Sequence, residues 1–260
     1  MDRITSASNS QIKNVVKLQK SARERKKQKL FVAEGWKLLQ EAKKAGQVEC
    51  VYATGAFVDD QQFSSLLSGL EVTILEDKLF YSLTDTMTPQ GVLALVHMPE
   101  YELKELLADD TGRFLLLENL RDPGNLGTIM RTAEGAGMNG VILSRESVDL
   151  FNPKVVRATM GSIFRQPFVY VEDIYETIKV MQSEGYCIVG TAMSGNCLYD
   201  EVDYSKRVGI VIGNEANGIT EEMLALVDKK VRIPMAGQLE SLNAAVAAAL
   251  FMYETARQRR

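Results

Sequence analysis

Short apolar runs alternate with longer amphipathic segments along most of the chain, a pattern typical of α/β proteins. Near-continuous Val and Ile runs such as VGIVIG at residues 208–213 indicate parallel strands that are buried on both faces. The predicted strands cover residues 30–33, 49–53, 71–75, 91–96, 114–117, 141–143, 168–171, 187–190, 208–212 and 230–233. The predicted helices cover residues 11–29, 36–42, 58–67, 77–82, 124–137, 152–160, 174–183, 221–226 and 241–257.

The polar and acidic segment 99–112 interrupts this alternation and ends in a turn. We therefore predict two domains. A smaller α/β domain covers residues 1–104, and an α/β domain built on a parallel sheet covers residues 113–260. A chain of 260 residues is long enough to bury a core in each.

Charge is distributed unevenly along the chain. The net charge is −4, yet residues 1–44 hold 12 Lys or Arg against 4 Asp or Glu, so this end carries +8 and the rest −12. Such asymmetry indicates that one end meets a polyanion such as RNA. We predict RNA contacts for the densest basic stretch, which holds Arg23, Arg25, Lys26, Lys27 and Lys29. A solvated helix face is the alternative explanation for the same pattern.

The cysteines and the apolar runs indicate where the protein works. Cys50, Cys187 and Cys197 are far apart, odd in number and without the spacing of a metal site, which favours a reducing cytoplasm. No apolar run reaches membrane-spanning length, and the first 20 residues lack the apolar stretch of a secretory signal. We expect a cytoplasmic protein with no metal site, in which the single histidine, His97, has a structural role.

Candidate chemistry lies in the loops that leave the predicted strands of the second domain, because ligands of parallel α/β sheets bind beyond the carboxyl ends of the strands. The loops of interest follow residues 114–117, 187–190, 208–212 and 230–233. In chain order they lead to Asn125 and Arg131, to Thr191 and Ala192, to Glu215, and to Ser241 and Asn243.

Each of these loops also has an ordinary structural explanation. Arg131 would be a surface arginine on a capped helix, Glu215 a solvated carboxylate in a turn, and Ser241 the N-cap of an alanine-rich helix. No GxGxxG or Walker sequence follows a strand, which counts against a nucleotide-dependent oxidoreductase and against triphosphate binding.

Taken together, three segments make the sequence recognisable: NLGTIMRTA at residues 125–133, IVIGNEANGI at 210–219 and IPMAGQLESLN at 233–243. In order and spacing they resemble the three signature motifs of the SpoU/TrmH family of RNA ribose 2′-O-methyltransferases, which belong to the SPOUT superfamily. This resemblance covers residues 113–260. Residues 28–98, which include FVAEGWKLLQEA, resemble more loosely the family's N-terminal domain for RNA substrate binding, a small fold related to RNA-binding ribosomal proteins.

The resemblance implies a deep trefoil knot in the C-terminal domain, S-adenosylmethionine as the methyl donor, and a homodimer formed through that domain. It implies that the cofactor is bound by Thr191, Ala192, Gly213, Ile233, Met235 and Leu242. It also implies that the catalytic residues around the target ribose are Asn125, Arg131, Glu215, Ser241 and Asn243.

The role of the arginine needs a physical decision. Proposals for the family make it the base, here Arg131, but a guanidinium loses its proton only at great cost. We expect Arg131 to hold a phosphate of the target and to stabilise developing alkoxide charge, with the proton passing to water or to a neighbouring group. Ala245 stands where many relatives have a small hydroxyl residue, which removes at most one auxiliary hydrogen bond.

The sequence therefore predicts methyl transfer from S-adenosylmethionine to a ribose 2′-hydroxyl of RNA. The additional N-terminal domain favours ribosomal RNA by analogy. A tRNA 2′-O-methyltransferase and a non-catalytic RNA-binding or ribosome-assembly factor on the same fold are the alternatives.

Overall fold

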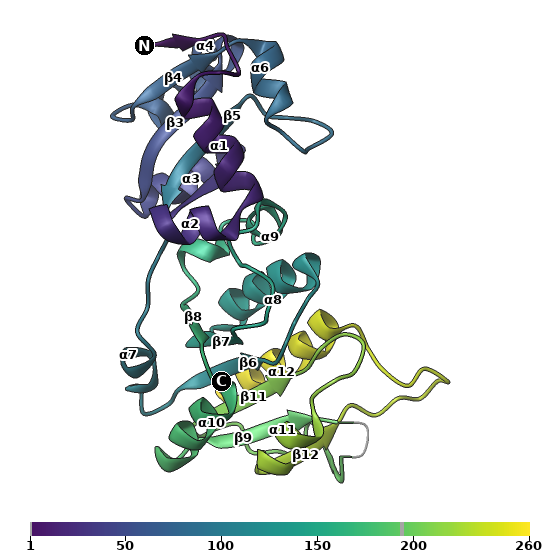
Figure 1. Ribbon diagram of the computed structural model, residues 1–260. Coiled ribbons are helices and arrows are strands. Elements are labelled where there is room, and N and C mark those ends of the chain that lie inside the picture. The colour runs from purple at the N-terminus through teal and green to yellow at the C-terminus, as the bar shows by residue number, and fades with distance from the viewer. Residues whose placement is uncertain (1, 193–194) are drawn as a thin grey trace. The chain divides into compact units, whose positions relative to one another are not determined.

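The chain forms two compact units in the computed structural model, which describes residues 2–192 and 195–260 (Figure 1). The first unit comprises the chain up to Pro99 together with Asp149–Phe164. The second comprises Glu100–Val148 and Arg165–Arg260. The division expected from the sequence places residues 149–164 in the second domain, whereas in the structure they pack with the first.

Within the described residues, the first unit is built on a five-stranded mixed sheet with the order β1-β4-β3-β5-β2. Strands β1, β4 and β3 are parallel, and β5 is antiparallel to both β3 and β2. The strands are β1 (Arg3–Ile4), β2 (Leu30–Glu34), β3 (Val48–Thr54), β4 (Val72–Leu75) and β5 (Val92–His97). The helices are α1 (Ser10–Lys20), α2 (Ala22–Gln28), α3 (Trp36–Lys44), α4 (Gly55–Asp59), η1 (Gln61–Phe63), α5 (Ser64–Leu67), α6 (Asp77–Ser82), α9 (Pro153–Ala158) and η2 (Ser162–Phe164).

Two predicted helices of this unit are broken. The helix expected over residues 11–29 is interrupted at Ser21, whose backbone is extended. The Ser21 N–H donates to the Lys17 carbonyl and closes α1, and its hydroxyl accepts from the Glu24 N–H and begins α2. In the helix expected over 58–67, Asp60 is extended and caps η1, which leaves three short pieces.

The core of the first unit has a layer on each side of β2. On one side, Ile12, Val15 and Leu18 of α1 pack against the sheet in a single apolar cluster with Val32. On the other side, the fully buried ring of Phe31 lies 5.0 Å from that of Phe151 and 6.0 Å from that of Phe164, measured between centroids. Residues 149–164 therefore supply part of this unit's core.

Within the described residues, the second unit is built on a seven-stranded sheet with the order β10-β12-β9-β11-β6-β7-β8, and every neighbouring pair is parallel. The predicted parallel-sheet α/β fold is thereby confirmed. The strands are β6 (Arg113–Leu117), β7 (Gly140–Ser144), β8 (Phe168–Val171), β9 (Cys187–Thr191), β10 (Cys197–Leu198), β11 (Val208–Ile212) and β12 (Lys229–Arg232). The helices are α7 (Leu103–Leu107), α8 (Pro123–Ala136), α10 (Ile174–Ser183), α11 (Glu221–Leu226) and α12 (Ala244–Gln258).

Helices cover both faces of this sheet, as the apolar strands require. Phe114 and Leu116 of β6 share a buried cluster with Ile178 of α10 and Met223 of α11. Side chains alternate along a strand, so Leu115 of β6 faces the opposite side of the sheet. The helices α8 and α12 lie side by side on that face (Figure 1). The polar segment expected as a linker contains α7, held by one buried leucine.

Four neighbouring strands position the candidate loops. Strands β12, β9, β11 and β6 are adjacent and parallel, so their carboxyl ends meet at one edge of the sheet. The loops singled out from the sequence all leave this edge. None of the helices in residues 2–192 and 195–260 is long and apolar enough to cross a membrane.

Candidate active site

The loops that follow β9, β11 and β12 enclose a cavity of about 830 Å³ in the second unit. Its lining includes all six residues that the resemblance assigns to the cofactor: Thr191, Ala192, Gly213, Ile233, Met235 and Leu242. It also includes Asn217, Leu224 and Arg232, which sequence reasoning did not single out. Leu224 belongs to the amphipathic α11, where its apolar character indicated only packing.

Gly213 lets the loop after β11 fold back on the end of the strand. A Cβ atom at this position would lie 2.1 Å from the carbonyl carbon of Gly218 and 2.2 Å from its oxygen, which leaves no room for a side chain. Two backbone hydrogen bonds between Asn214 and Gly218, of 2.9 and 2.8 Å, close the turn. Gly218 itself has φ +68°, a conformation that favours glycine.

A chain of hydrogen bonds connects three of the predicted catalytic residues. Asn243 donates from Nδ2 to Oδ1 of Asn125 at 2.9 Å, and Asn125 donates from Nδ2 to Oε1 of Glu215 at 3.1 Å. The N–H groups of Arg121 and Asp122 donate to the two oxygens of Glu215 at 3.1 and 2.9 Å. Residues separated by about 90 and 118 positions in sequence thus form one polar arrangement.

Hydrogen bonding at both ends fixes the orientation of the two amides. Glu215 as a carboxylate only accepts, so Asn125 must present its NH₂ group to Glu215 and its oxygen to Asn243. The oxygen of Asn243 accepts from the N–H groups of Ala245 and Val246, so its NH₂ group points at Asn125. The hydrogen bonds therefore run in one direction, from Asn243 to Asn125 and from Asn125 to Glu215.

Hydrogen bonds also set the ionisation of Glu215. Burial alone would raise the pKa of this carboxyl, but the bonds from Asn125 and from the Asp122 and Arg121 N–H groups outweigh it and hold the pKa below its usual value of 4.5. Glu215 is accordingly an anion at neutral pH. Because an anion accepts hydrogen bonds, Glu215 is suited to orienting the hydrogen-bond donors around it.

The cap of α12 differs from the prediction. Asn243 is the N-cap, because its side-chain oxygen accepts from the first free N–H groups of the helix. Ser241 lies two residues earlier in the cavity lining. Among the described residues, its hydroxyl makes no hydrogen bond.

Arg131 does not join this arrangement within one chain. It lies on α8 six residues after Asn125, which at 100° per residue places it on a different side of the helix. Its side chain is exposed, and it makes no ion pair or hydrogen bond among the described residues.

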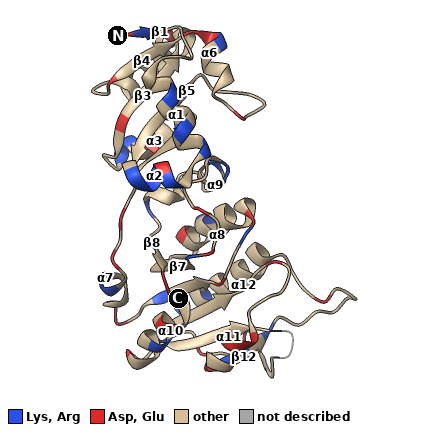
Figure 2. Ribbon diagram, in the orientation of Figure 1, with Lys and Arg blue, Asp and Glu red and all other residues tan. Residues whose placement is uncertain are grey.

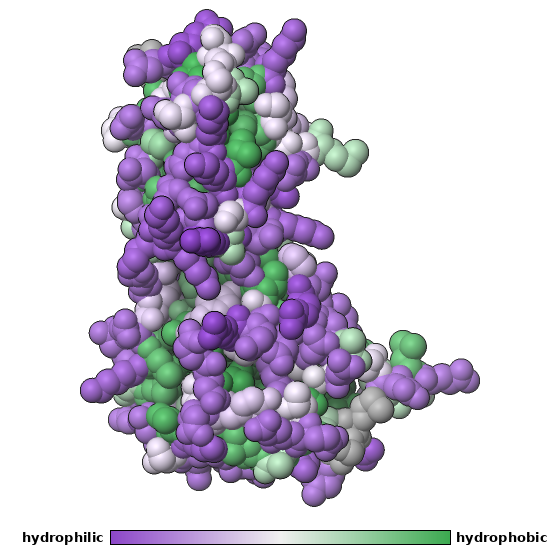
Figure 3. All heavy atoms as spheres, viewed as in Figure 1, coloured by the Kyte–Doolittle hydropathy of each residue, from purple (hydrophilic) through white to green (hydrophobic). Residues whose placement is uncertain are grey.

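The basic stretch divides into exposed residues and one buried residue. Arg23, Lys26, Lys27 and Lys29 are exposed on α2 and at its end, where Figure 2 shows a concentration of Lys and Arg and Figure 3 a hydrophilic surface. Arg25 is only 3% exposed. The prediction that it contacts RNA therefore needs correction.

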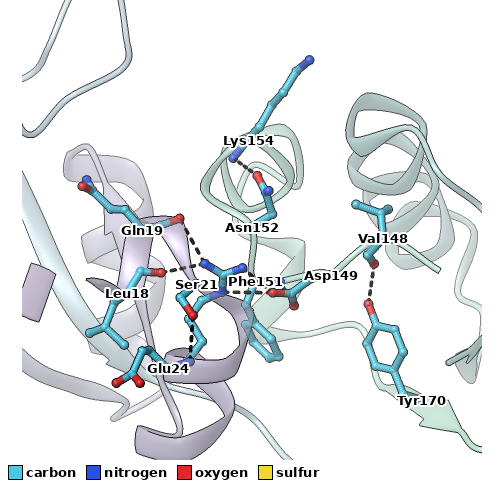
Figure 4. Close-up of polar contacts among 11 residues, drawn as sticks. Leu18, Gln19, Ser21, Glu24, Val148, Asp149, Phe151, Asn152, Lys154 and Tyr170 are labelled. Atoms are coloured by element: carbon cyan, nitrogen blue, oxygen red, sulfur yellow. Dashed lines mark hydrogen bonds and ion pairs between the residues drawn. The ribbon is translucent and has the colours of Figure 1, made fainter. Parts of the chain in front are cut away.

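Arg25 instead holds parts of the first unit together through Leu18, Gln19 and Asp149, which Figure 4 labels. Its Nε and Nη2 donate to Oδ2 of Asp149 at 3.0 and 2.5 Å, and its Nη1 donates to the carbonyls of Leu18 and Gln19 at 2.6 and 3.1 Å. The guanidinium thus joins the end of α1 to the segment that carries α9. Four of its five N–H groups are engaged in these bonds, and its burial leaves it away from any phosphate at the surface.

Among residues 2–192 and 195–260, no group of three or more His, Cys, Asp or Glu side chains is placed to hold a metal ion.

The fold and this arrangement correspond to a known family. Residues 112–253 match the SpoU rRNA Methylase family, and residues 9–94 match the MRM3-like substrate binding domain. The chain belongs to the SpoU rRNA methylase family, which confirms the family predicted from the three motifs. It is accordingly an RNA methyltransferase.

Relatives and solved structures of similar length support this assignment. The chain is 35% identical over 255 residues to the 23S rRNA (guanosine(2553)-2′-O)-methyltransferase RlmP of Bacillus subtilis, covering 97% of this chain and 98% of the relative. It superposes with a TM-score of 0.88 on the SpoU methyltransferase AviRb from Streptomyces viridochromogenes in complex with AdoMet, at 29% identity, covering 96% and 98% of the two chains. An AdoMet-bound rRNA methyltransferase from Sinorhizobium meliloti gives 0.87 at 32% identity, covering 98% and 97%.

Proposed function

We propose that this protein transfers the methyl group of S-adenosylmethionine to a ribose 2′-hydroxyl of ribosomal RNA. The observation that carries the proposal is the Asn243–Asn125–Glu215 hydrogen-bond chain at the edge of a cavity lined by all six residues expected to bind the cofactor. The 23S rRNA specificity of the Bacillus subtilis relative, which matches over nearly the whole length, favours ribosomal RNA over tRNA.

The cavity suits S-adenosylmethionine in size and chemistry. Its volume of about 830 Å³ lies in the range of ligand pockets, and its lining mixes backbone groups with apolar side chains such as Ile233 and Met235. The missing side chain at Gly213 leaves the loop backbone close to any bound molecule. The two AdoMet-bound structures of similar fold support the same cofactor here.

The polar chain would orient the ribose. Asn125 and Asn243 have fixed donor and acceptor ends. The second lone pair of the Asn125 oxygen and the second N–H of the Asn243 amide are available to a 2′-hydroxyl, whereas the Asn243 oxygen is fully used by the helix cap. Holding that hydroxyl in line with the methyl carbon converts binding energy into rate, because orientation alone removes much of the entropic barrier. Ser241 in the cavity lining would add a hydrogen bond to substrate or cofactor.

Arg131 would act in the active site of a partner subunit. It lies one helical turn before Gly135, where an added Cβ would be 3.5 Å from the exposed Tyr253 of α12. Val246 on α12 is exposed as well, so α8 and α12 present a partly apolar surface suited to a second copy of the chain. In such a homodimer Arg131 would hold the target phosphate and stabilise the developing alkoxide.

Mixing two inactive variants tests this arrangement. Arg131→Ala and Asn243→Ala subunits, unfolded and refolded together, should recover about a quarter of wild-type activity, because half of the dimers are mixed and each has one complete site. Either variant alone should stay inactive. No recovery in mixed dimers that are verified by mass would place Arg131 in the site of its own chain.

The exposed basic residues of α2 would bind the RNA backbone. Changing both Lys26 and Lys27 to Gln should weaken RNA binding at low salt and reduce the slope of log affinity against log salt by about 1.5, since each phosphate contact contributes about 0.7–0.9. Lys179→Gln, on the exposed surface of α10, is the matched control and should leave the slope unchanged.

Two finer features belong to the proposal, one implied by the family resemblance and one by the cysteines. We propose that the C-terminal part of the chain contains the family's deep trefoil knot. We also propose that the protein is cytoplasmic, as the free thiols of Cys50, Cys187 and Cys197 favour.

The decisive experiment uses labelled S-adenosylmethionine with purified 23S rRNA, 16S rRNA and tRNA as separate acceptors. We expect labelling of ribosomal RNA at a single nucleotide that becomes resistant to alkaline cleavage, the mark of a 2′-O-methyl group. Labelling of tRNA alone would overturn the rRNA assignment. Calorimetric binding of S-adenosylmethionine with no transfer to any acceptor would point instead to a non-catalytic RNA-binding factor.

A further inference from the structure

A buried carboxylate lies at the carboxyl end of β6, outside the residues singled out from the sequence. Glu118 directly follows the buried Leu115–Leu117 run and is only 1% exposed. Burying a carboxylate is costly unless hydrogen bonds replace its hydration. The hydrogen bonds of Glu118 therefore indicate what it holds.

Three donors satisfy this carboxylate, and two of them belong to Thr220. The Thr220 N–H donates to Oε2 at 2.9 Å and the Thr220 hydroxyl to Oε1 at 2.7 Å. The third is the Tyr175 hydroxyl, which donates to Oε1 at 2.8 Å. Burial above all, with the nearby Glu118 adding to it, raises the pKa of Tyr175, so its phenol remains a donor.

The neighbouring residue fastens the other end of the same loop. Asn214 donates from Nδ2 to the carbonyl of Asn119 at 2.9 Å. Asn119 has φ +57°, and its N–H donates to the Ser144 hydroxyl at 2.9 Å, which fixes this carbonyl in place. Consecutive residues at the end of β6 thus hold residues 214 and 220, the two ends of the loop between β11 and α11.

Everything between these two ends belongs to the candidate active site. The loop carries Glu215, which orients Asn125, and it contributes a continuous stretch of the cavity lining from Gly213 to Ile219. We infer that Glu118 is a positioning residue, which through Thr220 sets the geometry of the cofactor loop and of Glu215. The inference rests on the proposed function, because it assigns the cavity to S-adenosylmethionine.

Substitutions at Glu118 separate positioning from general stability. Glu118→Ala removes the acceptor for both Thr220 donors and should raise the Kd for S-adenosylmethionine at least tenfold and lower kcat, with the KM for RNA changed less than twofold. Glu118→Gln can turn its oxygen to the Thr220 N–H and its NH₂ group to the two hydroxyls, so it should restore most of the affinity. Tyr175→Phe removes one bond to Glu118 and the 3.2 Å contact with the Thr220 hydroxyl, but it leaves both Thr220 donors on Glu118, so it should change the Kd less than twofold.

A second pair of variants covers the case in which Glu118→Ala fails to fold. Thr220→Val keeps the N–H donor and loses the hydroxyl, and should raise the Kd several-fold. Thr220→Ser keeps both the N–H and the hydroxyl and should bind S-adenosylmethionine as the wild type does. The Thr220 hydroxyl also accepts from the Met223 N–H at the start of α11, so circular dichroism must show equal helix content in the two variants.

The outcomes are distinguishable. Calorimetry and single-turnover methyl transfer are measured on the folded fraction of each variant. A wild-type Kd and kcat in Glu118→Ala, together with a lowered melting temperature, would overturn the inference and leave Glu118 with a structural role only. If the wild-type protein itself does not bind S-adenosylmethionine, the proposed function fails, whatever the variants do.

Discussion

Replacing Asn243 by Asp separates its two hydrogen-bonding roles. The side-chain oxygen of Asn243 caps α12 through the N–H groups of Ala245 and Val246, and its NH₂ group donates to Asn125. Aspartate is nearly isosteric and caps a helix as well as asparagine does. Asn243→Asp therefore keeps the cap and removes only the donor.

The cost follows from the distances in the polar chain. In the variant, a carboxylate oxygen would face Oδ1 of Asn125 across 2.9 Å, acceptor against acceptor. If the Asn125 amide turned over to donate to it, its oxygen would face the Glu215 carboxylate across 3.1 Å. One hydrogen bond is lost in either case, which costs about 1–3 kcal/mol. If this cost raises the free energy of the transition state, methyl transfer slows about 5- to 150-fold.

Single-turnover transfer of labelled methyl groups, with melting temperatures measured in parallel, tests this reasoning. We expect Asn243→Asp to slow methyl transfer about 5- to 150-fold and to lower the melting temperature by about 2–4 °C for each kcal/mol of the lost contact. Asn243→Ala should lose a similar rate and also the cap, which contributes about 1 kcal/mol. A wild-type rate in Asn243→Asp would refute the reasoning and reduce Asn243 to a helix cap.

Three further predictions concern other parts of the molecule. Gly213→Ala places a Cβ 2.1 Å from the carbonyl carbon of Gly218, although two such carbon atoms need a separation of about 3.5 Å. The Kd for S-adenosylmethionine, measured by calorimetry, should therefore rise at least tenfold. Gly237→Ala has open space around the added Cβ and should bind normally. Arg25→Met leaves Asp149 without its partner and should destabilise the protein by about 2–3 kcal/mol in urea unfolding. The RNA affinity of the folded variant should be unchanged. A stable variant that has lost RNA affinity would show that Arg25 contacts RNA. The pKa of Glu215 is lowered on folding, so its contribution to stability is complete above pH 4.5 and disappears as the pH falls through the folded-state pKa. Melting temperatures should therefore differ between wild type and Glu215→Gln at pH 7 and converge in acid, and a constant difference would contradict this assignment.

The sequence predicted the second unit well because its signals are local. The strands of the parallel sheet are continuous apolar runs, and glycine and proline mark their ends. Asn125, Glu215 and Asn243 were found as members of three motifs, and the strand order then brings the motifs to one edge. The motifs do not show how the amide groups of Asn125 and Asn243 are oriented. Which amide end faces which neighbour follows only from hydrogen bonds across the fold.

The features that the sequence did not reveal depend on contacts between distant segments. Arg25 stands among exposed basic residues, and its ion-pair partner Asp149 follows 124 positions later. The burial of Leu150 and Phe151 in the first unit has no local signal, since two apolar residues in a loop suit either unit. Glu118 did carry a signal, a charged residue at the end of a wholly apolar strand. The first family motif, which begins seven residues later at Asn125, does not include it.

The return of residues 149–164 to the first unit has a consequence for biosynthesis. Chains are made from the N-terminus and most domains fold as they emerge, yet Phe31 meets its ring partners Phe151 and Phe164 only after β6, α8 and β7 have been made. The first unit therefore stays incomplete on the ribosome until residues 100–164, about a quarter of the chain, have been translated. A gene fragment that stops at Pro99 would encode a first unit whose Phe31 lacks its ring partners Phe151 and Phe164.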